Sequence, residues 1–256
     1  MTVLKSLASA FLMYSRIPMP SVEWKEENRR YALCFFPLIG AVIGGLLLLW
    51  QYVCGILNIG AILRGAVCVL LPILVTGGIH IDGFCDTTDA FASCADRPKK
   101  LAIMSDPHIG SFAVIGLCSM LLLQFALFCE IGNFAVIAVG YVLSRALSGV
   151  AAVTFRSARN EGTLQNFVKP AHKKITVAVL AIFAISCSAG MCLISLWSGI
   201  AVCIAAAVCM VVYRAVAYGN FGGITGDTEG WFLHITETTM LAAVFAGEKF
   251  VEVTAL

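Results

Sequence analysis

Long apolar segments alternate with short polar ones along most of this chain of 256 residues. A helix needs about 20 apolar residues to cross roughly 30 Å of hydrocarbon. The sequence therefore predicts about seven transmembrane helices, at residues 31–57, 59–79, 109–131, 133–155, 175–197, 199–221 and 231–247. In the first of these, Gly40 and Gly44 have the spacing that allows two membrane helices to approach closely, although this motif alone is weak evidence.

The first 20 residues contain an apolar run between Lys5 and Arg16. This segment is similar to a signal peptide, but the small-residue cleavage site of such a peptide does not follow it. Pro18 and Pro20 instead end the helix, because proline removes a backbone donor and clashes with the preceding turn. We therefore expect an interfacial or re-entrant helix at the N-terminus.

The composition supports the membrane assignment. Hydrophobic residues make up 60% and charged residues 12% of the chain, and the mean hydropathy is +0.92. Soluble domains carry about 25% charged residues, so we expect an all-α, polytopic integral membrane protein that forms one domain over residues 1–256. The net charge of +2 comes without a clustered basic stripe, which argues against nucleic acid as a partner. The eleven cysteines include no CxxC pair and are interpreted as packing residues.

Basic residues outside the predicted spans fall almost entirely on one side of the membrane. If the N-terminus is cytoplasmic, the loops on that side contain all of these residues except Lys249. Lys and Arg are enriched in the cytoplasmic loops of membrane proteins. We therefore expect the N-terminus to face the cytoplasm, together with the polar segments that follow the second and sixth spans.

Three aspartates, which together we call the acidic stripe, interrupt the apolar pattern after the second span. Asp82, Asp86 and Asp89 stand at positions i, i+4 and i+7, so on a helix they share a sector of about 60°. Like charges on one face repel unless a cation lies against them, and Mg²⁺ prefers oxygen ligands of this kind. A solvated acidic face is the simpler alternative, but polar groups at a membrane boundary are usually functional.

A further carboxylate, Asp227, follows the glycine-rich segment Gly222–Gly226 on the same predicted side. With the three aspartates it predicts an oxygen-ligand Mg²⁺ site. Mg²⁺ is usually completed by water and substrate phosphates, so such a site indicates phosphate or diphosphate chemistry. Arg145 and Arg214 lie within predicted spans, where each is expected either to pair with a carboxylate or to bind a phosphate. Glu237 is interpreted as a buried partner for an arginine.

Five motifs occur in order along the chain: Arg16-Ile17-Pro18, Gly77–Asp89 (GGIHIDGFCDTTD), Ile103–Phe112, Leu143-Ser144-Arg145 and Gly222–Thr228. Together they closely resemble the motifs of the cobalamin synthase family, whose members are also called adenosylcobinamide-GDP ribazoletransferases. The likeness extends over nearly the whole chain, and the glycine-histidine-aspartate block is highly specific.

The resemblance implies a multi-pass enzyme of the cell inner membrane in bacteria or archaea, with its active site facing the cytoplasm. A ribose hydroxyl of α-ribazole, or of its 5′-phosphate, would attack the diphosphate of adenosylcobinamide-GDP. GMP would leave, and adenosylcobalamin or its 5′-phosphate would form, with Mg²⁺ as cofactor. Small-molecule substrates and membrane lipid are the implied partners, and the sequence leaves open whether the chain forms a homo-oligomer.

The resemblance also assigns roles to residues. Asp82, Asp86, Asp89 and Asp227 are the expected metal ligands, and His80 and Asp106 are candidates for the catalytic base or for substrate positioning. Arg145, Arg214, His108 and Lys99 are the candidates for substrate binding.

Two departures from the family pattern stand out. Where the family commonly has Lys-Asp-Ser-Arg-Ile-Gly, this chain has Ser105–Gly110 (SDPHIG), so two basic positions are lost, and a protonated His108 would replace one of them. Glu229 stands where a leucine is common. We expect it to be either a fifth ligand or a solvated residue, and the solvated state is favoured.

Two other classes of protein remain as alternatives. A membrane prenyltransferase also binds Mg²⁺ and diphosphate through aspartates, but it is expected to carry two matched aspartate motifs, whereas this chain has one stripe and a dissimilar second element. A cation-coupled transporter is expected to place its carboxylates near the bilayer midplane. The carboxylates of this chain are predicted at one membrane boundary.

Overall fold

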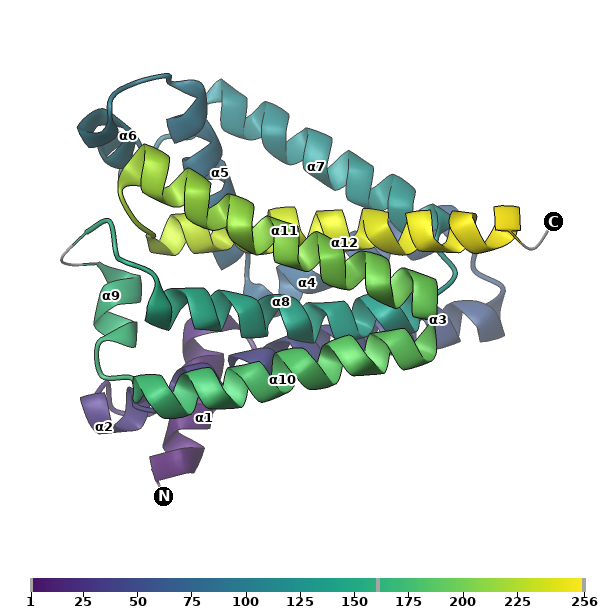
Figure 1. Cartoon of the computed structure of the whole chain (residues 1–256), viewed down its shortest axis with the longest axis horizontal. Helices are drawn as coiled ribbons and strands as arrows, with labels where there is room; N and C mark the ends of the chain where they lie inside the picture. Colours follow the sequence, from purple (N-terminus) through teal and green to yellow (C-terminus); the bar gives the residue numbers. More distant parts are fainter. Residues whose placement is uncertain (1, 160–161, 255–256) are drawn as a thin grey trace.

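The computed structural model describes residues 2–159 and 162–254, and every regular element in these ranges is a helix. The expected all-α fold is therefore confirmed. Each predicted span corresponds to one long helix, and these helices lie side by side (Figure 1). They are α3 (Phe36–Leu57), α4 (Ala61–Thr76), α7 (Ser111–Glu130), α8 (Phe134–Thr154), α10 (Lys173–Ile194), α11 (Leu196–Phe221) and α12 (Gly226–Thr254).

The number of membrane spans differs from the expected seven. Within the described residues, five helices are long and apolar enough to cross a membrane, and six if α4 and the helix that follows it count as one broken span. By itself α4 has only 16 residues. Helix α12 has 29 residues but carries several carboxylates, which lower its hydropathy. The multi-pass architecture is thus confirmed, whereas the count of seven is not.

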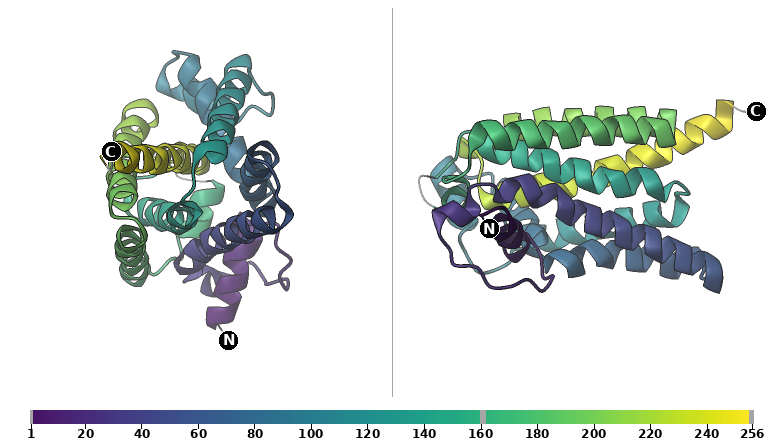
Figure 2. Two further views of the ribbon diagram at one scale, coloured as in Figure 1. Left: turned by 90° about the vertical axis from the view of Figure 1, so that its right-hand side faces the viewer. Right: turned by 90° about the horizontal axis from the view of Figure 1, so that it is seen from below.

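Helices α8 and α12 form the centre of the bundle. Helix α8 packs against α3, α10 and α12, and α12 packs against α11 and α8. In the most apolar 18-residue stretch of α8, 78% of the residues are buried, against 17% in the same stretch of α10. Most side chains of α10 therefore face outward. The nearly end-on view in Figure 2 shows how the other long helices surround this pair. A Cβ at Gly44 would lie 2.5 Å from the Ala138 carbonyl oxygen, so the predicted close approach through Gly40 and Gly44 is confirmed.

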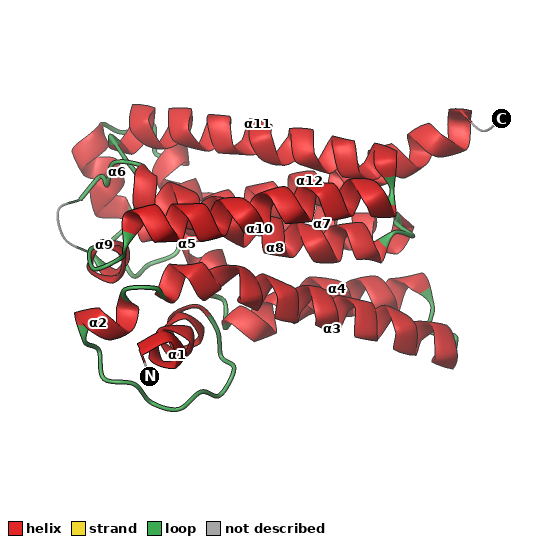
Figure 3. Cartoon of the chain, turned by 60° about the horizontal axis from the view of Figure 1, so that its bottom comes forward, coloured by secondary structure: helices red, strands yellow, loops and turns green. Residues whose placement is uncertain are grey.

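Short helices gather at the end of the bundle opposite the C-terminus (Figures 1 and 3). Helix α1 (Thr2–Tyr14) lies across this end and packs against α2, η1 and α3, so the predicted N-terminal helix is present. The other short elements are α2 (Glu26–Arg29), η1 (Ala32–Phe35), α5 (Ile79–Ala92), α6 (Arg97–Ile103) and α9 (Thr163–Val168).

A sharp turn between α4 and α5 places the acidic stripe. Gly77 and Gly78 both have left-handed backbone angles, with φ of 66° and 78°, a conformation that glycine adopts without steric cost. The chain bends by 97° at this point. Helix α5 therefore leaves the direction of the spans and lies across the end of the bundle, where its aspartates are accessible.

Candidate active site

Helix α5 crosses the beginning of α12 in direct backbone contact. A Cβ at Gly83 would lie 2.7 Å from Asp227 Cα, and a Cβ at Gly230 would lie 2.7 Å from the His80 carbonyl oxygen. Only glycine allows backbones to approach this closely. The crossing brings Asp227 beside Asp82, although the two residues are far apart in the sequence.

The start of α12 is fixed by two threonines. The Thr225 backbone N–H donates to Thr228 Oγ1 at 2.8 Å, and the Thr228 N–H donates to Thr225 Oγ1 at 3.1 Å. This reciprocal pair satisfies backbone groups that a helix N-terminus otherwise leaves free. Asp227 is consequently held in the first turn of α12, at the edge of the stripe.

The carboxylates of this region repel one another. Asp86 is half-buried, and its pKa is raised to about 7, mainly by burial and then by the negative charges of Asp82 and Asp227, with a smaller contribution from Asp89. None of the ion pairs formed by the described residues includes these carboxylates. A cation placed between them would relieve the repulsion.

Asp89 has a structural contact that the sequence did not indicate. Its carboxylate accepts the Gly110 N–H at 2.6 Å and the Ala113 N–H at 2.8 Å. It therefore caps the N-terminus of α7, where backbone donors and the helix dipole favour a negative charge. Both of its oxygens are used in this way, so its role as a metal ligand stays a prediction.

The carboxylates of this region other than Asp89 suit a hard cation. No group of three or more His, Cys, Asp or Glu side chains among the described residues converges on a metal position. Mg²⁺ commonly binds through one or two carboxylates and is completed by water and phosphate oxygens. Asp82, Asp86 and Asp227 supply oxygen ligands of this kind on two crossing helices, and they fit a shared Mg²⁺–phosphate site better than an all-protein cage.

Three cavities meet at Asp82. The first, of about 210 Å³, is the most enclosed of the three and lies between α1, η1, the start of α3, α5, α8, α9 and α12. The second, of about 480 Å³, is lined by Asp86, Asp106 and His108. The third, of about 500 Å³, is lined by Arg16 and the α4–α5 turn. Asp82 lines all of them, so molecules bound in different cavities would contact the same carboxylate.

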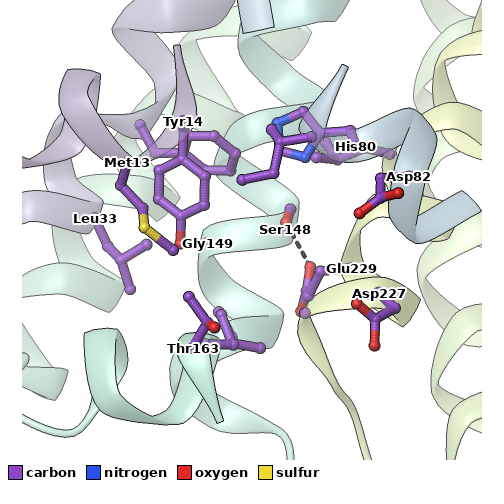
Figure 4. Close-up of a pocket in the computed structure, with 16 residues that line it drawn as sticks. Met13, Tyr14, Leu33, His80, Asp82, Ser148, Gly149, Thr163, Asp227 and Glu229 are labelled. Atoms are coloured by element: carbon purple, nitrogen blue, oxygen red, sulfur yellow. Dashed lines mark hydrogen bonds between the residues drawn. The ribbon is translucent and has the colours of Figure 1, made fainter. Parts of the chain in front are cut away.

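The enclosed cavity has an apolar and an acidic side (Figure 4). Tyr14 is on the apolar side, and Asp82 and Asp227 are on the acidic side. His80 and Glu229 are buried between them. The predicted base candidate His80 is thus at a cavity wall, with its ring stacked on Tyr14 at a centroid distance of 6.1 Å.

Other predicted residues lie farther from this cavity. Asp106 and His108 line the second cavity, where the His108 backbone N–H donates to Asp106 at 2.9 Å and its ring contacts the same oxygen at 2.7 Å. These hydrogen bonds lower the pKa of Asp106. Lys99 is exposed on α6. Arg214 is exposed on α11, with its guanidinium over the rings of Phe155 and Tyr218.

Arg145 forms a buried ion pair with Glu237, as one of the two interpretations of this arginine predicted. The pair joins α8 to α12 in the centre of the bundle. Ser144 Oγ accepts from the guanidinium at 2.8 Å and donates to Glu237 at 3.2 Å. Since the arginine is 1% exposed, this pair accounts for its charge without a substrate.

Sequence reasoning did not name Tyr14 and Ser148, which line the enclosed cavity. The favoured expectation of a solvated Glu229 is wrong, because this residue is only 6% exposed. The Ser148 hydroxyl, on the facing helix α8, donates to Glu229 Oε2. The replacement of the family's common leucine at this position was the available sign that it meets something polar.

The fold and this site define a multi-pass helical membrane protein with an acidic site at one end of its bundle. Residues 6–245 match the sequence model of the cobalamin-5-phosphate synthase family, and the chain belongs to this family. The resemblance seen in its motifs is therefore confirmed.

Relatives match over nearly their whole length. The adenosylcobinamide-GDP ribazoletransferase of Lachnoclostridium phytofermentans is 41% identical over 247 residues, which cover 96% of this chain and 95% of that protein. Proteins with the same name from Treponema denticola and Pseudomonas fluorescens are 31% and 30% identical, over 94% and 93% of this chain and 98% and 97% of their own lengths. These relatives are named as ribazoletransferases, so the chain is an enzyme of this family. No solved structure matches it.

Proposed function

We propose that the chain transfers the adenosylcobinamide-phosphate group of adenosylcobinamide-GDP to α-ribazole or α-ribazole 5′-phosphate. A ribose hydroxyl oxygen of the acceptor forms a bond to the phosphorus that carries the cobinamide. The bond from this phosphorus to the GMP oxygen breaks, GMP leaves, and the hydroxyl proton passes to a base. The names of the relatives support this reaction.

The observation that carries the proposal is the position of Asp82 where three cavities meet. A transfer between two large substrates requires that both reach one reacting centre. Separate cavities that share an acidic boundary provide such an arrangement. His80 and Asp106 stay the candidates for the base, since each lines one of these cavities.

Mg²⁺ is proposed as the cofactor, held by Asp82, Asp86 and Asp227. When bound, it would neutralise the diphosphate and stabilise the leaving GMP. Asp82 and Asp86 on α5 and Asp227 on α12 would hold the cation at this end of the bundle, where the two helices cross. Arg16, which lines the third cavity beside Asp82, supplies a positive charge for a phosphate oxygen.

We further propose that the enzyme resides in the cell inner membrane with this acidic end in the cytoplasm. The concentration of basic residues in the loops at this end supports the orientation. Outward-facing apolar side chains, such as Leu193 at 88% exposure and Val211 at 70%, would contact lipid or a second copy of the chain.

The reaction is tested by incubating the purified, lipid-reconstituted protein with adenosylcobinamide-GDP, α-ribazole and Mg²⁺, and by following GMP and cobalamin chromatographically. We expect product from the wild type and from Glu130→Gln, which alters an exposed carboxylate at the far end of α7. Product should be lost with a chelator and in Asp82→Asn. A folded wild-type protein that releases no GMP would refute the assignment, and full activity of Asp82→Asn would place the metal elsewhere.

A further inference from the structure

Two residues that line the enclosed cavity each have a buried polar atom without a partner. Glu229 Oε1 and His80 Nε2 have no hydrogen-bond partner among the described residues. Both residues line the cavity and are more than nine-tenths buried. An unsatisfied buried polar group costs about 1–3 kcal/mol. A ligand that hydrogen-bonds these groups would therefore recover that energy on binding.

Glu229 is held so that one oxygen stays available. Ser148 donates to its Oε2, as the dashed line in Figure 4 shows. The Tyr213 hydroxyl also interacts with this carboxyl, and it lies 3.2 Å from Thr228 Oγ1. Since the Thr225–Thr228 pair fixes this turn of α12, the carboxyl cannot easily turn away from the cavity.

The opposite wall of the cavity is aromatic. The rings of Tyr14 and Phe36 lie 4.5 Å apart between centroids, and His80 stacks on Tyr14 with an interplanar angle of 20°. All three rings line the cavity. Aromatic side chains of this kind stack with nucleobases, and each stacked base contributes about 1–3 kcal/mol.

The size of the cavity limits its ligand. Pockets for drug-sized molecules measure about 300–1,000 Å³, whereas this cavity measures about 210 Å³. This volume is small for a corrin macrocycle and suits a planar bicyclic ring system. Because Asp82 and Asp227 line the acidic side, a sugar and phosphate attached to that ring would extend toward the carboxylates.

From these observations we propose that the enclosed cavity binds the heteroaromatic base of a nucleoside, which packs against the aromatic wall of Tyr14, Phe36 and His80 and hydrogen-bonds Glu229 through a nitrogen on its edge. This inference rests on the proposed reaction, which supplies two such bases. Guanine of the GDP group would donate an N–H to the carboxylate. Ribazole, whose ring nitrogen only accepts hydrogen bonds, is the other possible occupant, and the test distinguishes the two bases.

The test measures binding of GMP and of α-ribazole separately, by equilibrium dialysis, to the reconstituted protein. The proteins compared are the wild type, Glu229→Gln, Glu229→Leu and the control Glu130→Gln. Loss of one hydrogen bond to a buried carboxyl should weaken binding of one nucleoside about ten- to a hundredfold in Glu229→Leu, while the other nucleoside binds as before. Weaker GMP binding identifies guanine as the occupant, and weaker ribazole binding identifies the acceptor base.

A second variant guards against local distortion around Glu229. Ala152→Phe fills the cavity from α8 and should weaken the binding of the same nucleoside. Unchanged binding of both ligands, or an equal loss of both, would overturn the proposal. Because dialysis requires no turnover, Glu229-dependent binding without product would refute the reaction alone. Product formation with unchanged nucleoside affinities would refute the base site alone.

Discussion

The crossing of α5 and α12 at Gly83 gives the sharpest prediction for the geometry of the site. A methyl group at this position would lie 2.7 Å from both Asp227 Cα and the Asp227 carbonyl oxygen. These are backbone atoms, which cannot move aside as a flexible side chain can. Ordinary contact begins at 3.4 Å, so Gly83→Ala requires the helices to separate by the difference, about 0.7 Å.

This separation should reduce activity more than stability. Overpacking typically costs about 1–3 kcal/mol, but replacing a helical glycine by alanine returns about 0.5–1 kcal/mol. We therefore expect a net loss of about 0–2.5 kcal/mol in the free energy of unfolding. Catalytic groups must be held within about 0.5 Å, and a misplacement of about 1 Å can cost a hundredfold in rate. The rate of GMP release should fall about ten- to a hundredfold.

The control is Gly45→Ala in α3. An added Cβ there meets nothing within 4 Å among the described residues, so stability should rise slightly and activity should be unchanged. Thermal unfolding in detergent and GMP release at saturating substrate, measured on both variants, check the prediction. Wild-type activity and stability in Gly83→Ala would show that the two backbones are not in contact. The inferred position of Asp227 beside the acidic stripe would then also be refuted.

Three further predictions concern charged residues. Glu237→Gln should destabilise the protein by about 3–5 kcal/mol in thermal unfolding, because it leaves Arg145 buried without its partner. The double variant Arg145→Met/Glu237→Leu should recover most of this loss. Equal stability of the single and double variants would contradict the pairing. Asp89→Ala should lose about 1 kcal/mol with the cap of α7, and Asp89→Asn less, as unfolding midpoints will show. Since the pKa of Asp86 is raised to about 7, protons should compete with Mg²⁺ for this carboxylate below that pH. The Mg²⁺ concentration for half-maximal activity should therefore rise as the pH falls from 8 to 6. If this concentration stays constant over that range, Asp86 is excluded as a ligand.

Hydropathy was sufficient to predict the long helices but not how many of them can span the membrane. Each apolar segment predicted as a span is a helix, because backbone groups in hydrocarbon must be satisfied within the segment. The pattern did not reveal that α4 ends after 16 residues, since the turn depends on the left-handed angles of Gly77 and Gly78. Sequence shows that glycine permits such angles, whereas only the packed structure shows that they are adopted.

Helical spacing predicted the position of the carboxylates better than their contacts. It placed Asp82 and Asp86 on one face of a helix, and in α5 Asp82 is exposed while Asp86 is half-buried. It did not show that Asp89 meets the N-terminus of α7, because that contact depends on where Gly110 lies in space. Glu229 was also misjudged, since its burial depends on Ser148 of a distant helix. Contacts between elements far apart in the chain leave no periodic pattern in the sequence.

The capping role of Asp89 changes how the metal site is expected to work. If both oxygens of Asp89 hold α7, the protein supplies the ligands of Asp82, Asp86 and Asp227 and leaves other coordination positions to water and phosphate oxygens. The mutual repulsion of these carboxylates favours a cation, but incomplete coordination limits its affinity. The diphosphate would then complete the coordination shell, so that tight metal binding and substrate binding occur together at the junction of the three cavities. In such a site the negative charges of the carboxylates and the phosphates are balanced by the cation only when the reacting phosphates are bound.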